Sequence, residues 1–429
     1  MMRNKVVILF GLLFCTMLCA KKVLWMEYIA CDNDLYRWAI LNLQDMAKVG
    51  SNDYLTIVAQ VDCLGAHGKT KRLHVLPNKI MEVSYGQKLD FGAVDTLVDF
   101  VEWAVRTYPA DEYVLNFWNH GSGFYDPTMG HNHKINSADG LFYFNPKTQL
   151  LEIDRSLPYI LLDEREPRGV CFCDTTQSYL SNVKLFDALT RITQFLGKKL
   201  SIIGFDACLM QMIEVVTQVK QFADYVVASP EVELASGWQY DYVFEPFNHE
   251  FLETSVLAHH IVASYERAYK NRTADYTLSA IDTRYVDDVI FAIDEVAHAF
   301  LTLLSFDHTK FIKKTLLACR HKNVCTTFSE PTYIDVHHFF KNVKAALVTL
   351  PVEPQVAAYS AAIRTVEDAL DRALACIEKA VHANVKGRNV PHSSGLSIYF
   401  PEKRIDVSYG TLIFGKNKWH DFIKMMVMY

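Results

Sequence analysis

Short apolar runs alternate along this chain with segments whose apolar residues recur every three or four positions. Such runs, bounded by polar and turn residues, are typical of buried strands, and the longer spacing is typical of amphipathic helices. In the first part of the chain, strands are expected at residues 23–31, 54–61, 113–118, 169–173, 200–205 and 224–229. Helices are expected at residues 35–50, 93–107 and 183–196 and directly after Cys208, with Asp32, Asn33 and Asp34 as N-caps of the first. This order predicts an α/β fold whose mostly parallel sheet is covered by helices on both faces.

The second part of the chain, after about residue 242, is dominated by helical spacing. Helices are expected at residues 252–270, 285–304, 334–350 and 355–382 and around Trp419, with strand-like runs at residues 276–282 and 395–400. The first part adds a hairpin with arms at residues 73–76 and 80–85. We therefore expect a leader at 1–20, an α/β domain at 21–241 and a mainly helical region with added strands at 242–429.

Residues 121–170 interrupt this regularity, because they are rich in glycine and proline and show little periodicity. A connection of this length inside a compact domain is usually functional or mobile.

The first twenty residues differ in composition from the rest. Arg3 and Lys5 precede an uncharged apolar run, and a small residue, Ala20, ends it. The run is short for a membrane span, which needs ~20 apolar residues, and the pattern is typical of an export signal. We expect an exported protein that is secreted, periplasmic or surface-anchored. Cleavage, lipid modification at Cys19 and a retained N-terminal anchor stay open.

Composition narrows the function only slightly. The 429 residues are 50% hydrophobic and carry a net charge of −6 without a long run of one sign, so nothing favours a nucleic-acid partner. Eight cysteines follow the leader, and none has the spacing of a zinc site, so no metal or cofactor is expected. Most are expected to be free or buried thiols. The sequence leaves disulfide pairing and oligomeric state open.

Two chemically active residue types each follow a predicted strand. His120 comes after the strand at 113–118, and Cys208 comes after the strand at 200–205. Ligands of parallel α/β sheets bind at the carboxyl ends of strands, so we expect the two side chains at one edge. A histidine beside a cysteine is the pair that nucleophilic catalysis needs, because the base activates the thiol. The pattern predicts a cysteine hydrolase, and specifically a protease.

Three features support this chemistry. A helix opening at Cys208 would favour the thiolate, and the N–H groups of Gly121 and Cys208 would form an oxyanion hole. Gly121 and Gly123 would let a substrate carbonyl approach the main chain. Asp206, two residues before Cys208, would share a face with it and bind a basic substrate side chain.

Each residue also has a structural interpretation. A histidine at a strand end can be a hydrogen-bonded structural residue, and a cysteine there can belong to the core. Asp206 can cap the following helix.

Five segments resemble clostripain-like cysteine peptidases, which are relatives of caspases, gingipains and legumains. They are VLWMEYIACDNDLYRWAILNLQDM, YPADEYVLNFWNHGSGF, IIGFDACLMQMIEV, DYVVASPEVELASGWQYDYVF and SSGLSIYFP. Together they span most of residues 22 to 401, and FDACLM combined with NHGSG is highly specific. The resemblance implies a caspase-like α/β/α sandwich, with His120 as base and Cys208 as nucleophile. It makes Asp206 the acid of the specificity pocket and implies cleavage after Arg or Lys in protein or peptide substrates.

The resemblance also raises self-processing, because family members are often one-chain zymogens cut between the histidine and cysteine segments. Candidate cleavage positions in the irregular stretch are Lys134, Lys147, Arg155, Arg165 and Arg168. Gln211 departs from the family, in which a glycine is common at that position. Trp238 and Tyr240 are candidate walls of the substrate pocket, with core aromatics as the equal alternative. Calcium assists some members, but no acidic pattern here resembles an EF-hand loop.

Two other functions remain open at this stage. One is a caspase- or legumain-like peptidase with a different preferred residue. The other is a non-enzymatic surface protein that has kept the scaffold.

Overall fold

A computed structural model describes residues 21–64, 68–125, 133–135, 138–162, 170–350 and 357–427. The expected leader at residues 1–20 lies outside the described residues. Within the described ranges, no helix combines the length and apolar character that a membrane crossing requires.

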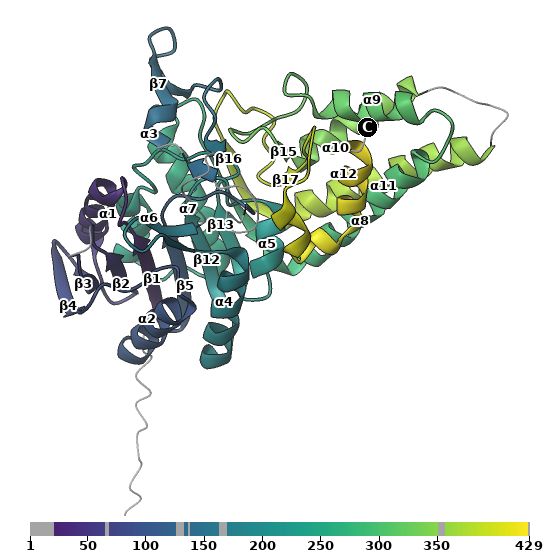
Figure 1. Ribbon diagram of the computed structural model, residues 1–429. Helices are drawn as coiled ribbons and strands as arrows, with labels where there is room; N and C mark the ends of the chain where they lie inside the picture. Colours follow the sequence, from purple (N-terminus) through teal and green to yellow (C-terminus); the bar gives the residue numbers. More distant parts are fainter. Residues whose placement is uncertain are drawn as a thin grey trace, which may run out of the picture.

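A nine-stranded sheet organises the molecule, with strands in the order β16–β14–β13–β12–β5–β1–β2–β3–β4 (Figure 1). The strands are β1 (Val23–Ala30), β2 (Leu55–Asp62), β3 (Thr70–Leu76), β4 (Lys79–Tyr85), β5 (Glu112–Trp118), β12 (Leu200–Asp206), β13 (Ala223–Ala228), β14 (Thr277–Asp282) and β16 (Val381–Lys386). The five central strands β13, β12, β5, β1 and β2 are parallel, and an antiparallel pair closes each side. The predicted mostly parallel sheet and the hairpin β3–β4 are therefore confirmed.

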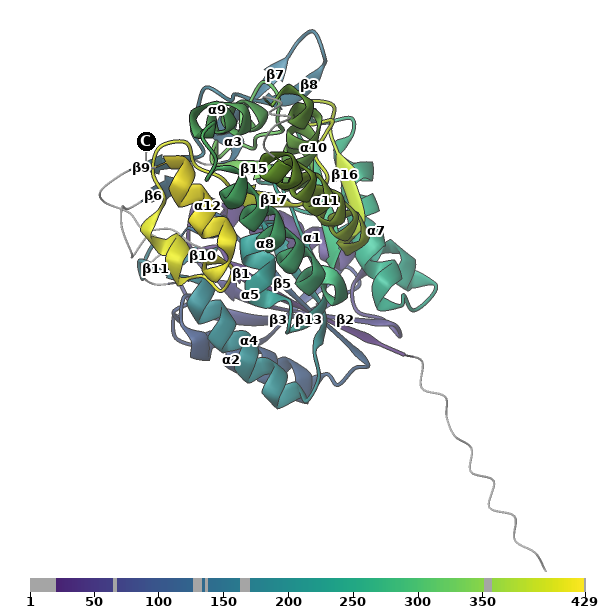
Figure 2. The same ribbon diagram turned by 90° about the vertical axis from the view of Figure 1, so that its right-hand side faces the viewer.

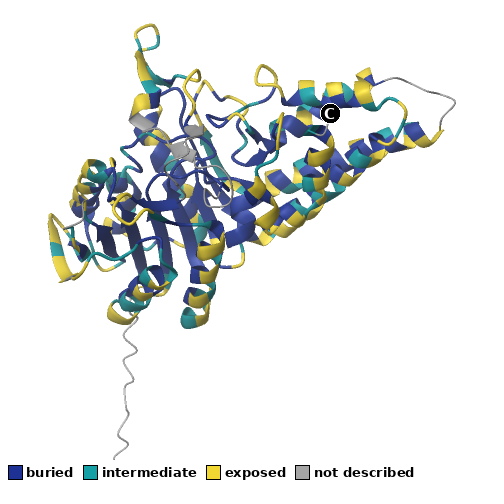
Figure 3. Ribbon diagram, viewed as in Figure 1, coloured by how far each residue is buried: buried dark blue, intermediate teal, exposed yellow. Residues whose placement is uncertain are grey.

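Helices cover both faces of the sheet, and its central strands are buried almost throughout (Figure 3). Along β1, Leu24, Met26 and Tyr28 face one hydrophobic core, and Trp25 and Ile29 face the other. The first core includes residues of α2 (Val94–Thr107), α4 (Asn182–Leu196) and α5 (Ile213–Val219). The second core includes residues of α1 (Tyr36–Val49), α6 (Tyr240–Phe244) and α7 (Thr254–Tyr269). The expected α/β/α sandwich is confirmed.

The later part of the chain forms a helical layer beside the sheet (Figure 2). It contains α8 (Val286–Leu303), α9 (Thr309–Arg320), α10 (Val336–Ala346), α11 (Ala357–Ala380) and α12 (Lys418–Val427). Within this part, β15 (Tyr333–Asp335) pairs with β17 (Ser397–Tyr399). However, β14 and β16 belong to the main sheet, so this part also completes the α/β layer. The division at residues 241 and 242 stays a proposal.

Several predicted elements differ in detail from the structure. The expected strand at 169–173 is β10 (Val170–Cys173), which pairs with β11 (Ser178–Leu180) outside the main sheet. The expected helix at 355–382 ends at Ala380, where β16 follows directly. The helix α9 and the hairpin β7 (Phe142–Asn145) with β8 (Leu150–Ile153) were not predicted.

The helix predicted after Cys208 is α5, but the prediction that Cys208 opens it is wrong. Leu209 has a φ of 63°, which a helix cannot accommodate, and α5 begins only at Ile213. The turn between them is held by the main chain of a neighbouring loop, because Leu209 N donates to Glu231 O and Gln211 N donates to Ser229 O.

Candidate active site

The carboxyl ends of β5 and β12 bring His120 and Cys208 to one cavity. These strands are parallel neighbours, with Asp206 opposite Trp118, so the residues that follow them emerge at the same edge. The cavity has a volume of about 20 Å³ and is lined by Leu35, Trp118, Asn119, His120, Asp206, Ala207, Cys208, Glu233, Leu234, Ala235 and Gly237. Such a volume holds about one water molecule, so the cavity is too small for a substrate side chain, and we call this arrangement the closed form.

The Cys208 thiol is buried, with 5% of the residue exposed. Its Sγ accepts a hydrogen bond from Glu233 N at 3.3 Å. Burial raises the pKa of Cys208 to about 12, a hydrogen bond from Tyr159 lowers it, and the charge of Glu233 raises it. Since α5 starts five residues later, no helix terminus supports the thiolate here. In this closed form the thiol is protonated at neutral pH.

The imidazole of His120 is buried and bound to a carboxylate that was not predicted to belong to the site. Its Nε2 lies 2.8 Å from Oδ1 of Asp34, in the turn between β1 and α1. Asp34 is one of the three expected N-caps, but Leu35 occupies the N-cap position of α1, and its N–H donates to Oδ1 of Asn33 at 3.0 Å. A carboxylate in this place fixes the orientation of the ring. Its position after β1, the neighbour of β5, is the signal that sequence reasoning missed.

Asp206 lies in the wall of the same cavity, and two hydrogen bonds from buried residues fix its carboxylate. Its Oδ2 accepts hydrogen bonds from Trp238 N at 2.9 Å and from the Tyr240 hydroxyl at 2.8 Å. Both aromatic side chains are buried in the second core, so their contribution at this site is to fix the Asp206 carboxylate. A helix cap by Asp206 is excluded, because Met212 occupies the N-cap position of α5.

Two further buried carboxylates lie near Asp206, and sequence reasoning missed both. Glu27 on β1 accepts from Trp25 Nε1 and Asn116 Nδ2, and its Oε1 lies 2.9 Å from the Tyr240 hydroxyl. Glu233 lines the cavity itself. Among the described residues, no lysine, arginine or histidine forms an ion pair with Glu27, Asp206 or Glu233.

Burial of these acids without a cation raises their pKa values. Burial raises the pKa of Asp206 to about 7 and that of Glu27 to about 8, where the charge of Asp206 adds to the effect. The pKa of Glu233 is raised well above its usual range by burial and by the charge of Asp206. A cationic side chain entering this cavity would compensate these carboxylates.

Position 121 needs a glycine because the main chain after β5 packs directly against the main chain at Cys208. A Cβ on Gly121 would collide with the carbonyl oxygen of Cys208. Gly123 has a φ of 67°, and a Cβ there would collide with the sulfur of Met212. Both glycines therefore serve contacts within the protein itself. Tyr159, from the irregular stretch, donates its hydroxyl to Gly121 O at 3.0 Å and also reaches the thiol.

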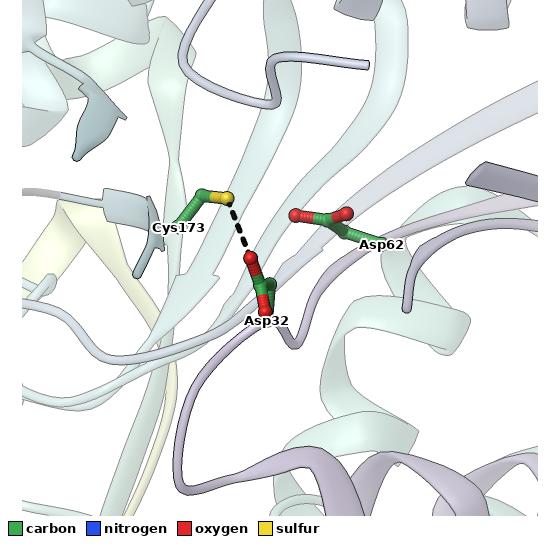
Figure 4. Close-up of side chains that lie close together, drawn as sticks. All are labelled: Asp32, Asp62 and Cys173. Atoms are coloured by element: carbon green, nitrogen blue, oxygen red, sulfur yellow. Dashed lines mark hydrogen bonds between the residues drawn. The ribbon is translucent and has the colours of Figure 1, made fainter. Parts of the chain in front are cut away.

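Beside this site lies a group of side chains with ligand atoms suited to a metal ion, namely Asp32, Asp62 and Cys173 (Figure 4). Cys173 donates to Asp32 Oδ2 at 3.1 Å. Lys88 Nζ lies 2.8 Å from one oxygen of each carboxylate. The ammonium group supplies the positive charge that the two acids require, so the arrangement fits an ion-pair network that fixes the turn after β1.

All eight cysteines after the leader are free in the structure, as predicted for most of them.

We predict that Gly121→Ala destabilises the fold by about 1–3 kcal/mol, because the new methyl group forces the Cys208 loop away from β5. Thermal unfolding measures the change. Gly140→Ala is the matched control, since a Cβ there meets no atom within 4 Å. Equal melting temperatures for the two variants would contradict the close approach.

Comparisons with known proteins agree with the architecture. The sequence model of the clostripain family, peptidase family C11, matches residues 27–140 and 159–409. Clostripain of Hathewaya histolytica is 25% identical over 256 residues, which are 52% of this chain and 42% of that protein. The match thus spans less than half of the relative's length.

Two solved structures share the fold. A secreted C11 cysteine protease from Bacteroides thetaiotaomicron, in complex with an irreversible peptide inhibitor, has a TM-score of 0.58 at 17% identity, over 94% of this chain and 99% of that chain. An inactive zymogen C11 protease from Parabacteroides distasonis has a TM-score of 0.56 at 16% identity, over 92% and 98%. With the family match covering most of its length, this chain belongs to the clostripain family of cysteine peptidases.

Proposed function

We propose that this protein is a cysteine endopeptidase that cleaves peptide bonds after basic residues, Arg and also Lys. The observation that carries the proposal is a single cavity lined by a thiol, an imidazole and two carboxylates, those of Cys208, His120, Asp206 and Glu233. The thiol and imidazole supply covalent chemistry, and the carboxylates supply recognition of a cation.

In the proposed mechanism, His120 takes the proton of the Cys208 thiol, and the thiolate sulfur attacks the substrate carbonyl carbon. The N–H groups of Cys208 and Gly121 stabilise the oxyanion. The imidazolium, oriented by Asp34, donates its proton to the leaving amine as the C–N bond breaks. Water then attacks the acyl-enzyme, with His120 as base, and releases the acid product and the thiol. The ring and the thiol form no direct hydrogen bond in the described structure, as is common before substrate binds.

Recognition of a basic side chain rests on buried acids that no cation of the described chain compensates and that can ionise when a cationic side chain enters. Asp206 and Glu233 line the cavity, and Glu27 lies behind Asp206 across the Tyr240 hydroxyl. Burying a carboxylate without a partner costs several kcal/mol, which an entering guanidinium or ammonium group would recover. The same charges disfavour an acidic side chain, which supports basic specificity over a caspase-like preference.

The closed cavity supports synthesis as an inactive single chain. About 20 Å³ admits no arginine side chain, and Tyr159 lies on Gly121 O beside the nucleophile. We propose that self-cleavage in the segment between His120 and Cys208 opens the site. Lys147 is exposed in the turn of the β7–β8 hairpin. Arg165, Arg168 and the side chain of Lys134 lie outside the described residues.

We also propose that the protein is exported, on the basis of the pattern of its first twenty residues. One protease of similar fold is described as secreted. Cell fractionation followed by N-terminal sequencing tests this.

The decisive assay is cleavage of a peptide library by the parent protein, Cys208→Ala and His120→Ala. We expect cleavage after Arg and Lys by the parent and a loss of at least about 10³-fold in both variants, because the nucleophile or its base is missing. Circular dichroism shows whether the variants are folded. Undiminished cleavage by Cys208→Ala would refute the catalytic assignment, and a folded parent inactive on every peptide would favour the non-enzymatic alternative.

Substrate recognition should depend on the ionisation of Asp206. Its pKa of about 7 means that the carboxylate forms as pH rises through 7, so KM for an Arg substrate should fall over that range. Asp206→Asn should lower kcat/KM by about 10²-fold, since a buried charge pair is worth about 3 kcal/mol. It should also flatten the pH dependence of KM. Initial rates between pH 5.5 and 8.5 measure both, and an unchanged profile in Asp206→Asn argues against this pocket.

Opening of the site should also raise the rate at which the Cys208 thiol is alkylated. In the uncut chain, burial and a pKa of about 12 should make Cys208 react slowly with iodoacetamide at pH 7. In the cut form the same thiol should react at least about tenfold faster, since reactivity follows access and thiolate content. Mass spectrometry of a preparation containing both forms gives the two rates, with the partly exposed Cys63 and Cys376 as internal controls. Equal rates at Cys208 would show that the uncut site is already open.

A further inference from the structure

One arginine of the segment between His120 and Cys208 binds two acids in the body of the protein. Arg155 Nη2 lies 3.0 Å from Oε2 of Glu231 and 2.9 Å from Oδ1 of Asp275. Both acids are buried, at 0% and 1% exposure, whereas the arginine side chain is 37% exposed. A single cation from the surface therefore bridges two acids in the interior.

The segment before Arg155 is docked through its main chain. Leu151 N donates to Arg272 O at 2.8 Å, and Leu151 O accepts from Ala274 N at 3.1 Å. Ile153 N donates to Oδ2 of Asp275 at 3.0 Å. Both the main chain of β8 and the guanidinium of Arg155 therefore attach this segment to residues 272–275.

Glu231, the first partner of Arg155, belongs to the loop that holds the nucleophile. Its main-chain oxygen accepts from Leu209 N, next to the nucleophile, at 3.2 Å. Two residues further on, Glu233 N donates to Sγ of Cys208. The Glu231 carboxylate in turn fixes the loop, because its Oε1 accepts from Val232 N at 2.9 Å and from Ser329 N at 2.8 Å.

We propose that Arg155 is a positioning residue for Cys208 and is itself not a processing site. The inference rests on the proposed function of Cys208 as nucleophile. Glu231 and Asp275 share the guanidinium of Arg155, which reduces the repulsion between them and keeps the loop of residues 229–233 in the place from which it holds the thiol.

Charge compensation explains why one residue has this effect. Without the guanidinium, two buried carboxylates would face one another with no cation between them, a costly arrangement. The loop relieves the repulsion by moving, and Leu209 N and the thiol lose their fixed partners. Negative charge at Glu231 also disfavours the thiolate of Cys208, so an uncompensated Glu231 opposes catalysis electrostatically.

The same contacts argue against cleavage after Arg155. A protease must bind the arginine side chain in its own specificity pocket with the main chain extended, but here the guanidinium is held by two acids. Of the predicted processing positions whose side chains the structure describes, Lys147 is exposed and Arg155 is engaged.

The test compares the parent with Arg155→Gln, Arg155→Lys and the double variant Arg155→Gln/Glu231→Gln, each made as the full chain and assayed in its processed form. We expect Arg155→Gln to lower kcat on an Arg peptide at least about tenfold, with KM changed less than about twofold. The lysine variant should lie between it and the parent, because an ammonium group lacks the planar fork of guanidinium. The double variant should recover most of the lost kcat, since removing the Glu231 charge removes the need for compensation.

Arg388→Gln is the matched control. Arg388 also forms an ion pair with the segment between His120 and Cys208, at Glu152. The two charged groups are 3.8 Å apart and the Arg388 side chain is half exposed, so kcat should change little in Arg388→Gln. An unchanged kcat in Arg155→Gln, an equal loss in Arg388→Gln, or no recovery in the double variant would overturn the proposal. If Arg155→Gln fails to fold, the lysine and double variants carry the comparison.

Two further readouts separate this proposal from the proposed function. The pH profile of iodoacetamide labelling at Cys208 should move to higher pH in Arg155→Gln and return in the double variant, even on a protein that cleaves no peptide. A parent that labels in this way but shows no peptidase activity would refute the function and leave the positioning role standing. N-terminal sequencing of processed protein should find no new N-terminus at Ser156. A terminus there would mean cleavage after Arg155 and would refute its positioning role.

Discussion

The parallel pairing of β5 with β12 is the constraint on which the candidate active site depends. It joins two segments far apart in sequence and fixes the edge at which both end. The pairing is permitted because each strand is buried on both faces and contributes to two separate cores. Small residues support the close contacts, since a Cβ at Gly121 or Gly204 would collide with the neighbouring segment. Side chains at this edge therefore inherit the rigidity of the sheet.

Buried acidity is the second organising feature. Three carboxylates lie in or behind one cavity, held by neutral donors such as Trp238 N and the Tyr240 hydroxyl. Several acids can be buried together in a protein interior only when they are partly protonated or when a cation binds between them. The fold meets the same problem differently elsewhere, with Lys88 between Asp32 and Asp62 and with Arg155 between Glu231 and Asp275. In the cavity beside Cys208, by contrast, no cation of the described chain compensates the acids.

The fold could largely be predicted from local pattern, because the central strands are long apolar runs with helical segments between them. The placement of His120, Cys208 and Asp206 followed from the rule that parallel strands present their carboxyl ends together. Asp34 and Glu27 could not be assigned to the site, because their proximity depends on β1 lying beside β5, which no local pattern reveals. Glu233 lies in a loop whose path depends on Glu231 and its partners. The helix after Cys208 begins later than predicted, at Ile213, because loop contacts override local propensity and hold Leu209 in a left-handed conformation.

The attachment of β8 has a consequence for the order of assembly. Arg155 and Asp275 are 120 residues apart in sequence. During synthesis, the segment that carries Arg155 therefore leaves the ribosome long before Asp275, to which it will bind, has been made. Strands β1, β2, β5, β12 and β13 precede Asp275, and β14 and β16 follow it. Since chains fold from the N-terminus as they are made, the parallel centre of the sheet can form while this segment is still undocked. Docking of β8 is therefore a late step in the folding of the protein, coupled to completion of the sheet by β14 and β16.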